Sequence, residues 1–370
     1  AFVNTHTHIP MSFFRGIADD LKLDIWLEKH IWPLERKWLS GEFVRDAAKL
    51  AICELIRSGT SACADMYFFV DELAETFSAA GMRGVFSPGV LDFKSPHAAN
   101  PKEYLKKAEE LVKKYADDPL ADIGIAPHAP YTVSPGTYRL AADFALKHDI
   151  ILHTHLAETR WENETVAERF HKRPLELLKE CGVFECKSLL AHVIHINDEE
   201  VLFLGEINAD ISHCIESAFK LGSGYPDMGR LYRAGANISI GTDGAASNND
   251  LSMLGELSTA FRFHRIFSEN SPFTPEILFR SATINGGKAL SKPELGTLNA
   301  GSAADFFVFD YESERPEDPF HEMITVGENK RITHLFVNGK PLMRKRKILA
   351  LDEEDALDRA VFWQKKISQG

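Results

Sequence analysis

One type of segment recurs along the chain. Each copy is a short run of apolar and β-branched residues that ends in polar, chemically reactive side chains and is followed by a stretch of helical period. The eight runs are residues 2–8, 60–67, 84–91, 122–128, 150–158, 188–195, 209–213 and 237–243. The pattern predicts strands that alternate with helices.

Two of the intervening stretches show the helical period clearly. Residues 104–115 carry Lys and Glu on one face, and residues 137–148 repeat apolar positions at Leu140, Phe144 and Ala145. Eight strand–helix units are the number that closes a (β/α)₈ barrel, whose catalytic residues lie at the carboxyl ends of the strands. The alternative, an open doubly wound sheet, would place a Gly-rich phosphate loop after its first strand, where residues 4–8 read NTHTH. We therefore predict an α/β protein built on a TIM barrel.

The pattern changes after Ser291. Residues 305–310, 332–337 and 341–350 read as short strands, and Asn338-Gly339 reads as a hairpin turn. Residues 352–366 form an amphipathic helical pattern that closes the sequence. We expect a (β/α)₈ barrel at 1–290, a small β-sandwich element at 291–350 and a C-terminal helix at 351–370.

Composition and charge exclude several classes of protein. With 44% apolar and 26% charged residues, the chain can bury a large core. A net charge of -12 disfavours binding to nucleic acid or to an anionic membrane surface, and no apolar run approaches the ~20 residues that span a bilayer. Five cysteines without paired C-x-x-C spacing indicate a reducing compartment, which we take to be the cytoplasm. The expected partner is a small molecule, and a homo-oligomer is possible.

Histidines and carboxylates gather at the predicted strand ends. His6 and His8 are two residues apart on a strand, so both imidazoles point to the same side, at the mouth of the barrel. His155, His192 and Asp243 end other strands. Together they could form a shell of three histidines and one carboxylate that leaves one position for water. His192 could bind the metal or orient the nucleophile, and the sequence leaves both roles open.

Glu158 follows His155 by three residues and is a candidate proton acceptor for a metal-activated water. A bound metal lowers the pKa of its water to about 7, and the proton must then be carried away. Glu158 is placed to take it to the substrate without binding the metal, as a non-ligand Glu does in zinc deaminases of another fold.

The sequence of the fourth strand favours a site with one metal ion over a site with two. Barrel hydrolases with two ions commonly bridge them with a carboxylated lysine late in this strand, whereas residues 126–130 read APHAP. His128 is then free to contact the substrate.

The remaining histidines and one basic run receive weaker assignments. His153 shares a face with His155 but lies one layer deeper, as a packed and hydrogen-bonded side chain would. His195 should face away from the site, and His213 is a candidate for the mouth of the barrel. The basic residues 344–347 are interpreted as a solvated turn without function.

Taken together, these motifs resemble the amidohydrolase superfamily, in its branch of 5'-methylthioadenosine/S-adenosylhomocysteine deaminases and triazine chlorohydrolases. The resemblance covers nearly the whole sequence. It is carried by NTHTH at 4–8, PM at 10–11, RG at 15–16, WPLE at 32–35, PHAPY at 127–131, HTHLAET at 153–159, AH at 191–192 and GTDGAASNN at 241–249.

The resemblance implies roles for these residues. Those matching His6, His8, His155 and Asp243 hold one metal ion, zinc or alternatively iron, and Asp243 is also counted as catalytic. Those matching Glu158 and His192 handle the water and its protons. Glu35 would hold the ribose hydroxyls, His128 the purine ring, and Trp32 would be a further substrate contact. Residues 296–310 and 337–340 are similar to the C-terminal half of the family's small β-domain, whose N-terminal half we expect to be absent here.

Two departures from the family pattern bear on the substrate. After the seventh strand the family usually reads Ser-His-Asn-Pro-x-Ser-Asn, whereas residues 214–219 here read CIESAF. Members that bind S-adenosylhomocysteine carry an arginine after the third strand, at the position that Pro88 matches.

These observations favour a metal-dependent deaminase of an adenine nucleoside, with 5'-methylthioadenosine preferred over S-adenosylhomocysteine. The first alternative is an aminohydrolase or chlorohydrolase of a free purine, pterin or triazine, which would give Glu35 no ribose to hold. The second is a non-catalytic, metal-stabilised binding protein, which would leave Glu158 without a purpose.

Overall fold

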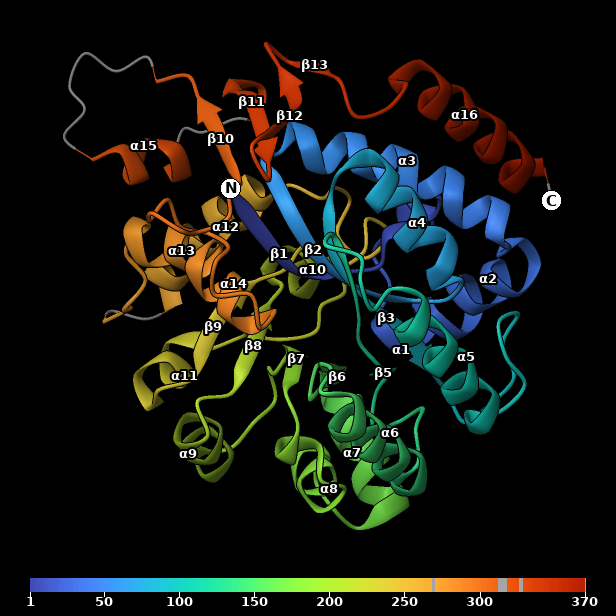
Figure 1. Cartoon of the computed structure of the whole chain (residues 1–370). Helices are drawn as coiled ribbons and strands as arrows, with labels where there is room; N and C mark the ends of the chain where they lie inside the picture. The colour runs from blue at the N-terminus through green and yellow to red at the C-terminus, as the bar shows by residue number, and fades with distance from the viewer. Residues whose placement is uncertain (268–269, 312–317, 326–328, 370) are drawn as a thin grey trace.

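A computed structural model describes residues 1–267, 270–311, 318–325 and 329–369 of the chain (Figure 1). In these residues all eight predicted runs form strands. They are β1 (Phe2–Thr7), β2 (Thr60–Tyr67), β3 (Arg83–Val90), β4 (Ala121–Ile123) with β5 (Ala126–Pro127), β6 (Leu152–Leu156), β7 (Ser188–His192), β8 (Asp210–His213) and β9 (Asn237–Ile240). The fourth run is divided at Gly124 and Ile125, and Ile125 forms a parallel bridge with Leu152 of β6. Gly124 packs closely on its neighbours, since a Cβ atom there would lie 2.3 Å from the Ser87 hydroxyl.

The strands form two parallel sheets that meet at two seams. One sheet has the order β1-β2-β3-β4, with β5 on β3, and the other has the order β6-β7-β8-β9. At one seam Ile125 N donates to Ile151 O and His153 N donates to Ile125 O, both at 2.9 Å. At the other seam Asp243 N donates to His6 O at 2.9 Å. The two sheets thus enclose a common core with the helices around it, as a (β/α)₈ fold does (Figure 1).

Helices follow the strands around the outside. They are α3 (Gly41–Arg57), α4 (Val70–Ala80), α5 (Pro101–Lys114), α6 (Pro135–His148), α7 (Arg160–Phe170), α8 (Pro174–Glu180), α9 (Asp198–Glu206), α10 (Ile215–Lys220), α11 (Met228–Ala234), α12 (Met253–Phe267), α13 (Pro275–Ser281) and α14 (Ile284–Ala289). The Asn100 side chain caps α5 by accepting a hydrogen bond from Glu103 N, and the helix buries Tyr104, Ala108 and Leu111 on one face.

Both predicted helices are confirmed, with one correction to the face of α6. Phe144 and Ala145 are buried as the pattern predicts, but Leu140 is 45% exposed. Ala141 lies on the inner face instead, together with Tyr138 and Phe144.

The segment between β1 and α3 lies over the carboxyl ends of the strands. It contains η1 (Ile9–Phe14), α1 (Leu23–Trp26), the π-helical turn η2 (Leu27–Ile31) and α2 (Trp32–Trp38). Side chains from α1, η2 and α2 line the same pocket as the histidines at the strand ends. This segment therefore forms one wall of the site.

The C-terminal part forms a separate antiparallel sheet in the order β10 (Phe306–Phe309), β11 (Ile332–Val337), β12 (Lys340–Arg344) and β13 (Lys347–Ile348). The predicted turn is confirmed, because Asn338 and Gly339 have φ of 51° and 73°. The sheet and helix α16 (Glu353–Gln369) lie beside α3, on one side of the barrel, and α15 (Pro319–Thr325) packs against α12 and α13 (Figure 1). The boundaries at 290/291 and 350/351 stay a prediction.

Two details of this sheet differ from the sequence interpretation. The expected strand at 341–350 is two strands, because Lys345 and Arg346 adopt left-handed φ values of 48° and 66°. The prediction that residues 344–347 are only a solvated turn was wrong for Arg346. Its Nη1 atom donates to the carbonyl oxygens of Arg57, Asn329 and Ile332, at 3.1, 2.6 and 2.9 Å.

Candidate active site

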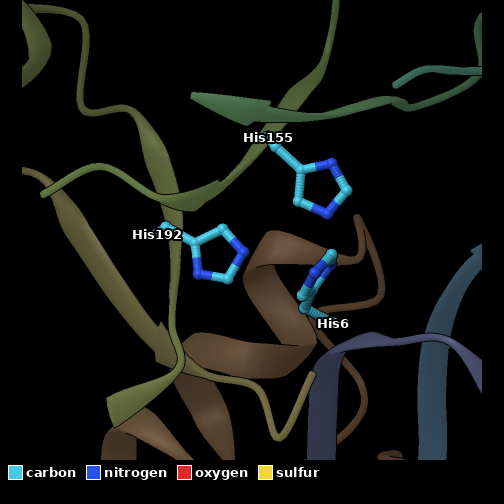
Figure 2. A group of neighbouring side chains, drawn as sticks. All are labelled: His6, His155 and His192. Atoms are coloured by element: carbon cyan, nitrogen blue, oxygen red, sulfur yellow. The ribbon is translucent and has the colours of Figure 1, made fainter. Parts of the chain in front are cut away.

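The four predicted metal ligands meet at the carboxyl ends of β1, β6 and β9. All of them are buried. His8 Nε2 lies 3.2 Å from Asp243 Oδ1 and 3.3 Å from His155 Nε2, and His6 Nε2 lies 3.5 Å from Asp243 Oδ1. Figure 2 shows the rings of His6, His155 and His192 directed toward one another from three different strands.

Backbone carbonyls fix the orientation of two of these rings. His8 Nδ1 donates to Met66 O and His155 Nδ1 donates to His128 O, each at 2.8 Å. A carbonyl oxygen only accepts, so each Nδ1 keeps its hydrogen and each Nε2 atom faces the centre of the site. Burial opposes a charge on His8, but the hydrogen bond and the charge of Asp243 raise its pKa to about 9, so a metal ion would displace a proton from its Nε2 atom.

His6 is oriented by a second histidine. Its Nδ1 lies 2.9 Å from Nε2 of His153, which is fully buried one layer deeper, as predicted. His153 therefore packs behind a ligand and holds the plane of its ring.

The geometry of these groups fits one divalent metal ion. Two ligands of a tetrahedral zinc ion, each 2.0–2.1 Å from it, lie about 3.3 Å apart, which matches the separations above. Within the described part of the chain, His6 Nε2 is buried without a hydrogen-bond partner. Burial lowers the pKa of His6 to about 4 and that of His155 well below its usual range, so both rings are in the neutral form that binds metals.

Asp243 is held by groups that the sequence interpretation did not identify. Its Oδ2 accepts a hydrogen bond of 2.6 Å from Ser217 Oγ, and its Oδ1 accepts one of 2.7 Å from Gly244 N. Ser217 lies on α10, whose first N–H groups, at Ile215 and Glu216, donate to the buried carboxylate of Glu256. The segment 214–219, which departs from the family pattern, thus retains a serine that orients the Asp243 carboxylate.

Glu158 lies just past β6 and is buried beside the metal donors. The chain turns at Ala157, whose φ is 49°, and the Glu162 carboxylate accepts hydrogen bonds from Ala157 N at 2.9 Å and Glu158 N at 2.8 Å. Burial, reinforced by the charge of Asp243, raises the pKa of Glu158 to about 8. A carboxyl group with a pKa near neutrality can both accept and donate a proton under physiological conditions.

His192 stands between Glu158 and the metal donors. Its Nε2 lies 3.8 Å from Glu158 Oε2, and its ring is stacked on that of His155 with centroids 5.4 Å apart. Left-handed φ values of 72° at His192 and 51° at Val193 turn the chain sharply after β7. A nitrogen of His192 also lies within 4.8 Å of donor atoms of His6 and His155, so its place suits both a metal ligand and a group that orients the nucleophile.

A pocket of about 710 Å³, including its open mouth, leads to these groups. All three predicted substrate contacts, Trp32, Glu35 and His128, line it. Glu35 Oε1 accepts a hydrogen bond of 2.5 Å from the Tyr67 hydroxyl, and burial raises the pKa of Glu35 to about 7. Among the described residues that line the pocket, none is Lys or Arg.

The structure also shows where two further histidines lie. His213 was wrongly considered for the mouth of the barrel, because it is buried against His264, with the two Nε2 atoms 3.2 Å apart, and does not line the pocket. His195 lies outside the pocket, as predicted, and contacts the loop that carries Ser223.

No helix in the described ranges is long and apolar enough to cross a membrane.

This chain is similar to known proteins over most of its length. The amidohydrolase family model matches residues 1–342. A 5-methylthioadenosine/S-adenosylhomocysteine deaminase of Thermodesulfovibrio yellowstonii is 38% identical, over 99% of this chain and 84% of its own length. A 5'-deoxyadenosine deaminase of Methanopyrus kandleri is 35% identical, over 97% and 84%.

Among solved structures, an adenosine deaminase from Xanthomonas campestris with bound zinc superimposes with a TM-score of 0.97 and 32% identity, over 100% of this chain and 85% of that one. The match of the family model and the identity to these relatives extend over almost the whole sequence. The chain belongs to the amidohydrolase family.

Proposed function

We propose that this protein is a metal-dependent hydrolytic deaminase of adenine nucleosides, with a preference for those whose 5' substituent is uncharged. The observation that carries the proposal is that a cluster of histidines with Asp243, the buried carboxyl group of Glu158 and the carboxyl group of Glu35 line one mainly apolar pocket. The names of the relatives described above support the same reaction class.

The site residues divide the reaction among them. A zinc ion, or alternatively iron, held by His6, His8, His155 and Asp243 would lower the pKa of a bound water to about 7 and so supply the nucleophile. Glu158 accepts one proton from the attacking water and delivers it to the ring nitrogen beside the attacked carbon. The second proton of that water passes to the exocyclic amino group, the carbon–nitrogen bond breaks, ammonia leaves, and the product carries a carbonyl at that carbon.

Residues of the pocket wall orient the substrate. The carboxylate of Glu35, fixed by Tyr67, accepts hydrogen bonds from ribose hydroxyls, while Trp32 and His128 contact the purine. A free purine, pterin or triazine would leave Glu35 buried without those partners, and an unsatisfied buried polar group is costly.

The surroundings of the 5' substituent favour an uncharged group. Leu23, Trp26 and Leu27 line the pocket, and Pro88 is buried within β3. Two arginines that could have replaced the missing cation are engaged elsewhere, since Arg15 pairs with Glu54 and Arg83 pairs with Asp305. The carboxylate of S-adenosylhomocysteine would therefore enter without a cationic partner.

An ammonia-release assay on the metal-replete protein tests the proposal. The panel contains 5'-methylthioadenosine, adenosine, S-adenosylhomocysteine, adenine, guanine, a pterin and a triazine. We expect ammonia and the matching inosine derivative from the uncharged nucleosides. Release from a free heterocycle but not from nucleosides would support the first alternative, and release from none would support a binding protein.

A further inference from the structure

Ser223 contacts the proton carrier directly, from a part of the chain far from it in sequence. The residue is only 4% exposed and lies between α10 and α11, 65 positions after Glu158. Its hydroxyl donates a hydrogen bond of 3.0 Å to Glu158 Oε1. Because Ser223 does not line the pocket, this hydroxyl faces the carboxylate and not the substrate.

The backbone around Ser223 is shaped to direct that hydroxyl. Gly222 and Gly224 have left-handed φ values of 61° and 137°, which residues with a Cβ atom rarely adopt. A Cβ atom on Gly224 would also lie 2.6 Å from His195 Nε2. Ser223 N in turn donates to Ala218 O at 2.9 Å, which ties the loop back to α10.

His195 connects this loop to the one that carries Glu158. Its Nε2 donates to Ser223 O at 2.6 Å, and its backbone N donates to Ala157 O at 2.8 Å. Its own carbonyl oxygen accepts hydrogen bonds from the side chains of Asn163 and Arg173. His195 is therefore fixed through its ring, its backbone N–H and its backbone C=O.

We propose that Ser223 is a positioning residue for Glu158, an inference that rests on the proposed function. With Oε1 engaged by Ser223, the carboxylate presents Oε2 toward His192, at 3.8 Å. The proton moves from water to Oε2 and from Oε2 to the purine, while the serine keeps its own proton throughout. Glu162 holds the backbone of Glu158, and Ser223 holds its carboxylate.

Removing the hydroxyl should slow the chemical step without weakening binding. A hydrogen bond to a charged group corresponds to about a ten- to hundredfold change in rate. We therefore expect Ser223→Ala to lower kcat for 5'-methylthioadenosine by about that factor, with KM and metal content unchanged. Ser223→Thr retains the hydroxyl and should recover most of kcat.

Two controls separate positioning from a loss of folding. Ser78 on α4 donates to the Asp118 carboxylate at 2.9 Å, which is the same kind of pair outside the site, so Ser78→Ala should leave kcat unchanged. The melting temperature of each variant is measured alongside the kinetics. The double variant Ser223→Ala/Glu158→Gln should be no slower than Glu158→Gln alone, because Ser223 acts through Glu158.

The outcomes distinguish this inference from the proposed function. If the unmodified protein deaminates nucleosides and Ser223→Ala keeps its full kcat, or if the losses of the two substitutions multiply in the double variant, Ser223 does not position Glu158. If the unmodified protein deaminates no nucleoside, the proposed function itself fails.

Discussion

The Nε2 atoms of His8 and His155 lie 3.3 Å apart, although 147 residues separate them in the sequence. Each ring donates its Nδ1 hydrogen to a carbonyl oxygen, so both Nε2 atoms face the centre of the site. Burial opposes a charge on His8, but the hydrogen bond and the charge of Asp243 raise the pKa of His8 to about 9, so without a metal ion this ring carries a second proton. A metal ion bound between the rings would take the place of that proton. The seam hydrogen bonds that join the two sheets also bring these donors together from two halves of the barrel.

Glu158→Gln should separate proton transfer from binding. Glutamine has the shape of the acid but cannot take a proton from water, so kcat should fall by about 10²–10⁴-fold while KM and metal content are retained. The measurement combines steady-state ammonia release with metal analysis of the same preparation. Near-normal turnover would exclude Glu158 as the proton carrier, and loss of the metal would make it a ligand.

The pocket should discriminate between neutral and charged 5' substituents. Without a lysine or arginine among its described lining residues, it offers S-adenosylhomocysteine no charge-assisted hydrogen bond, whose worth is about 1.5–3 kcal/mol. We expect kcat/KM at pH 7.5 to be about one to two powers of ten lower than for 5'-methylthioadenosine. Equal values, or a preference for S-adenosylhomocysteine, would show that a cation reaches the pocket from elsewhere.

Glu35 should make the stability of the protein depend on pH. Burial raises its pKa from 4.5 to about 7, so between these values the folded state keeps a proton that the unfolded state has lost. The free energy of unfolding therefore falls as pH rises through this interval, by about 3 kcal/mol for this group. Denaturant unfolding at pH 5 and pH 8 should show a smaller decrease in Glu35→Gln than in the unmodified protein. An identical decrease in the two proteins would place the titration elsewhere.

Much of the barrel could be predicted from the sequence, because the polar residues that end each apolar run mark both the end of a strand and the side chains of the site. His6 and His8 on one strand, and His155 at the end of another, fix which side of the barrel binds the metal. The same alternation placed His153 one layer deeper, where it packs behind His6.

Groups that act through a second residue could not be predicted. Ser217, Ser223 and Glu162 are common residue types in loops or helices, and their roles depend on contacts with Asp243 and Glu158 that span 4 to 65 residues. The contacts of Arg346 could not be predicted for the same reason. A basic run in a turn gives no sign that one member reaches three carbonyl oxygens of other segments.

Metal titration of the metal-free protein tests the central claim most directly. Zinc is added in steps, and ammonia release from 5'-methylthioadenosine is measured at each step, with His8→Ala as the control that lacks one ligand. Activity should rise linearly and level off at one zinc ion per chain, and His8→Ala should neither retain zinc nor gain activity. A plateau at two ions per chain, or full activity without metal, would contradict the account.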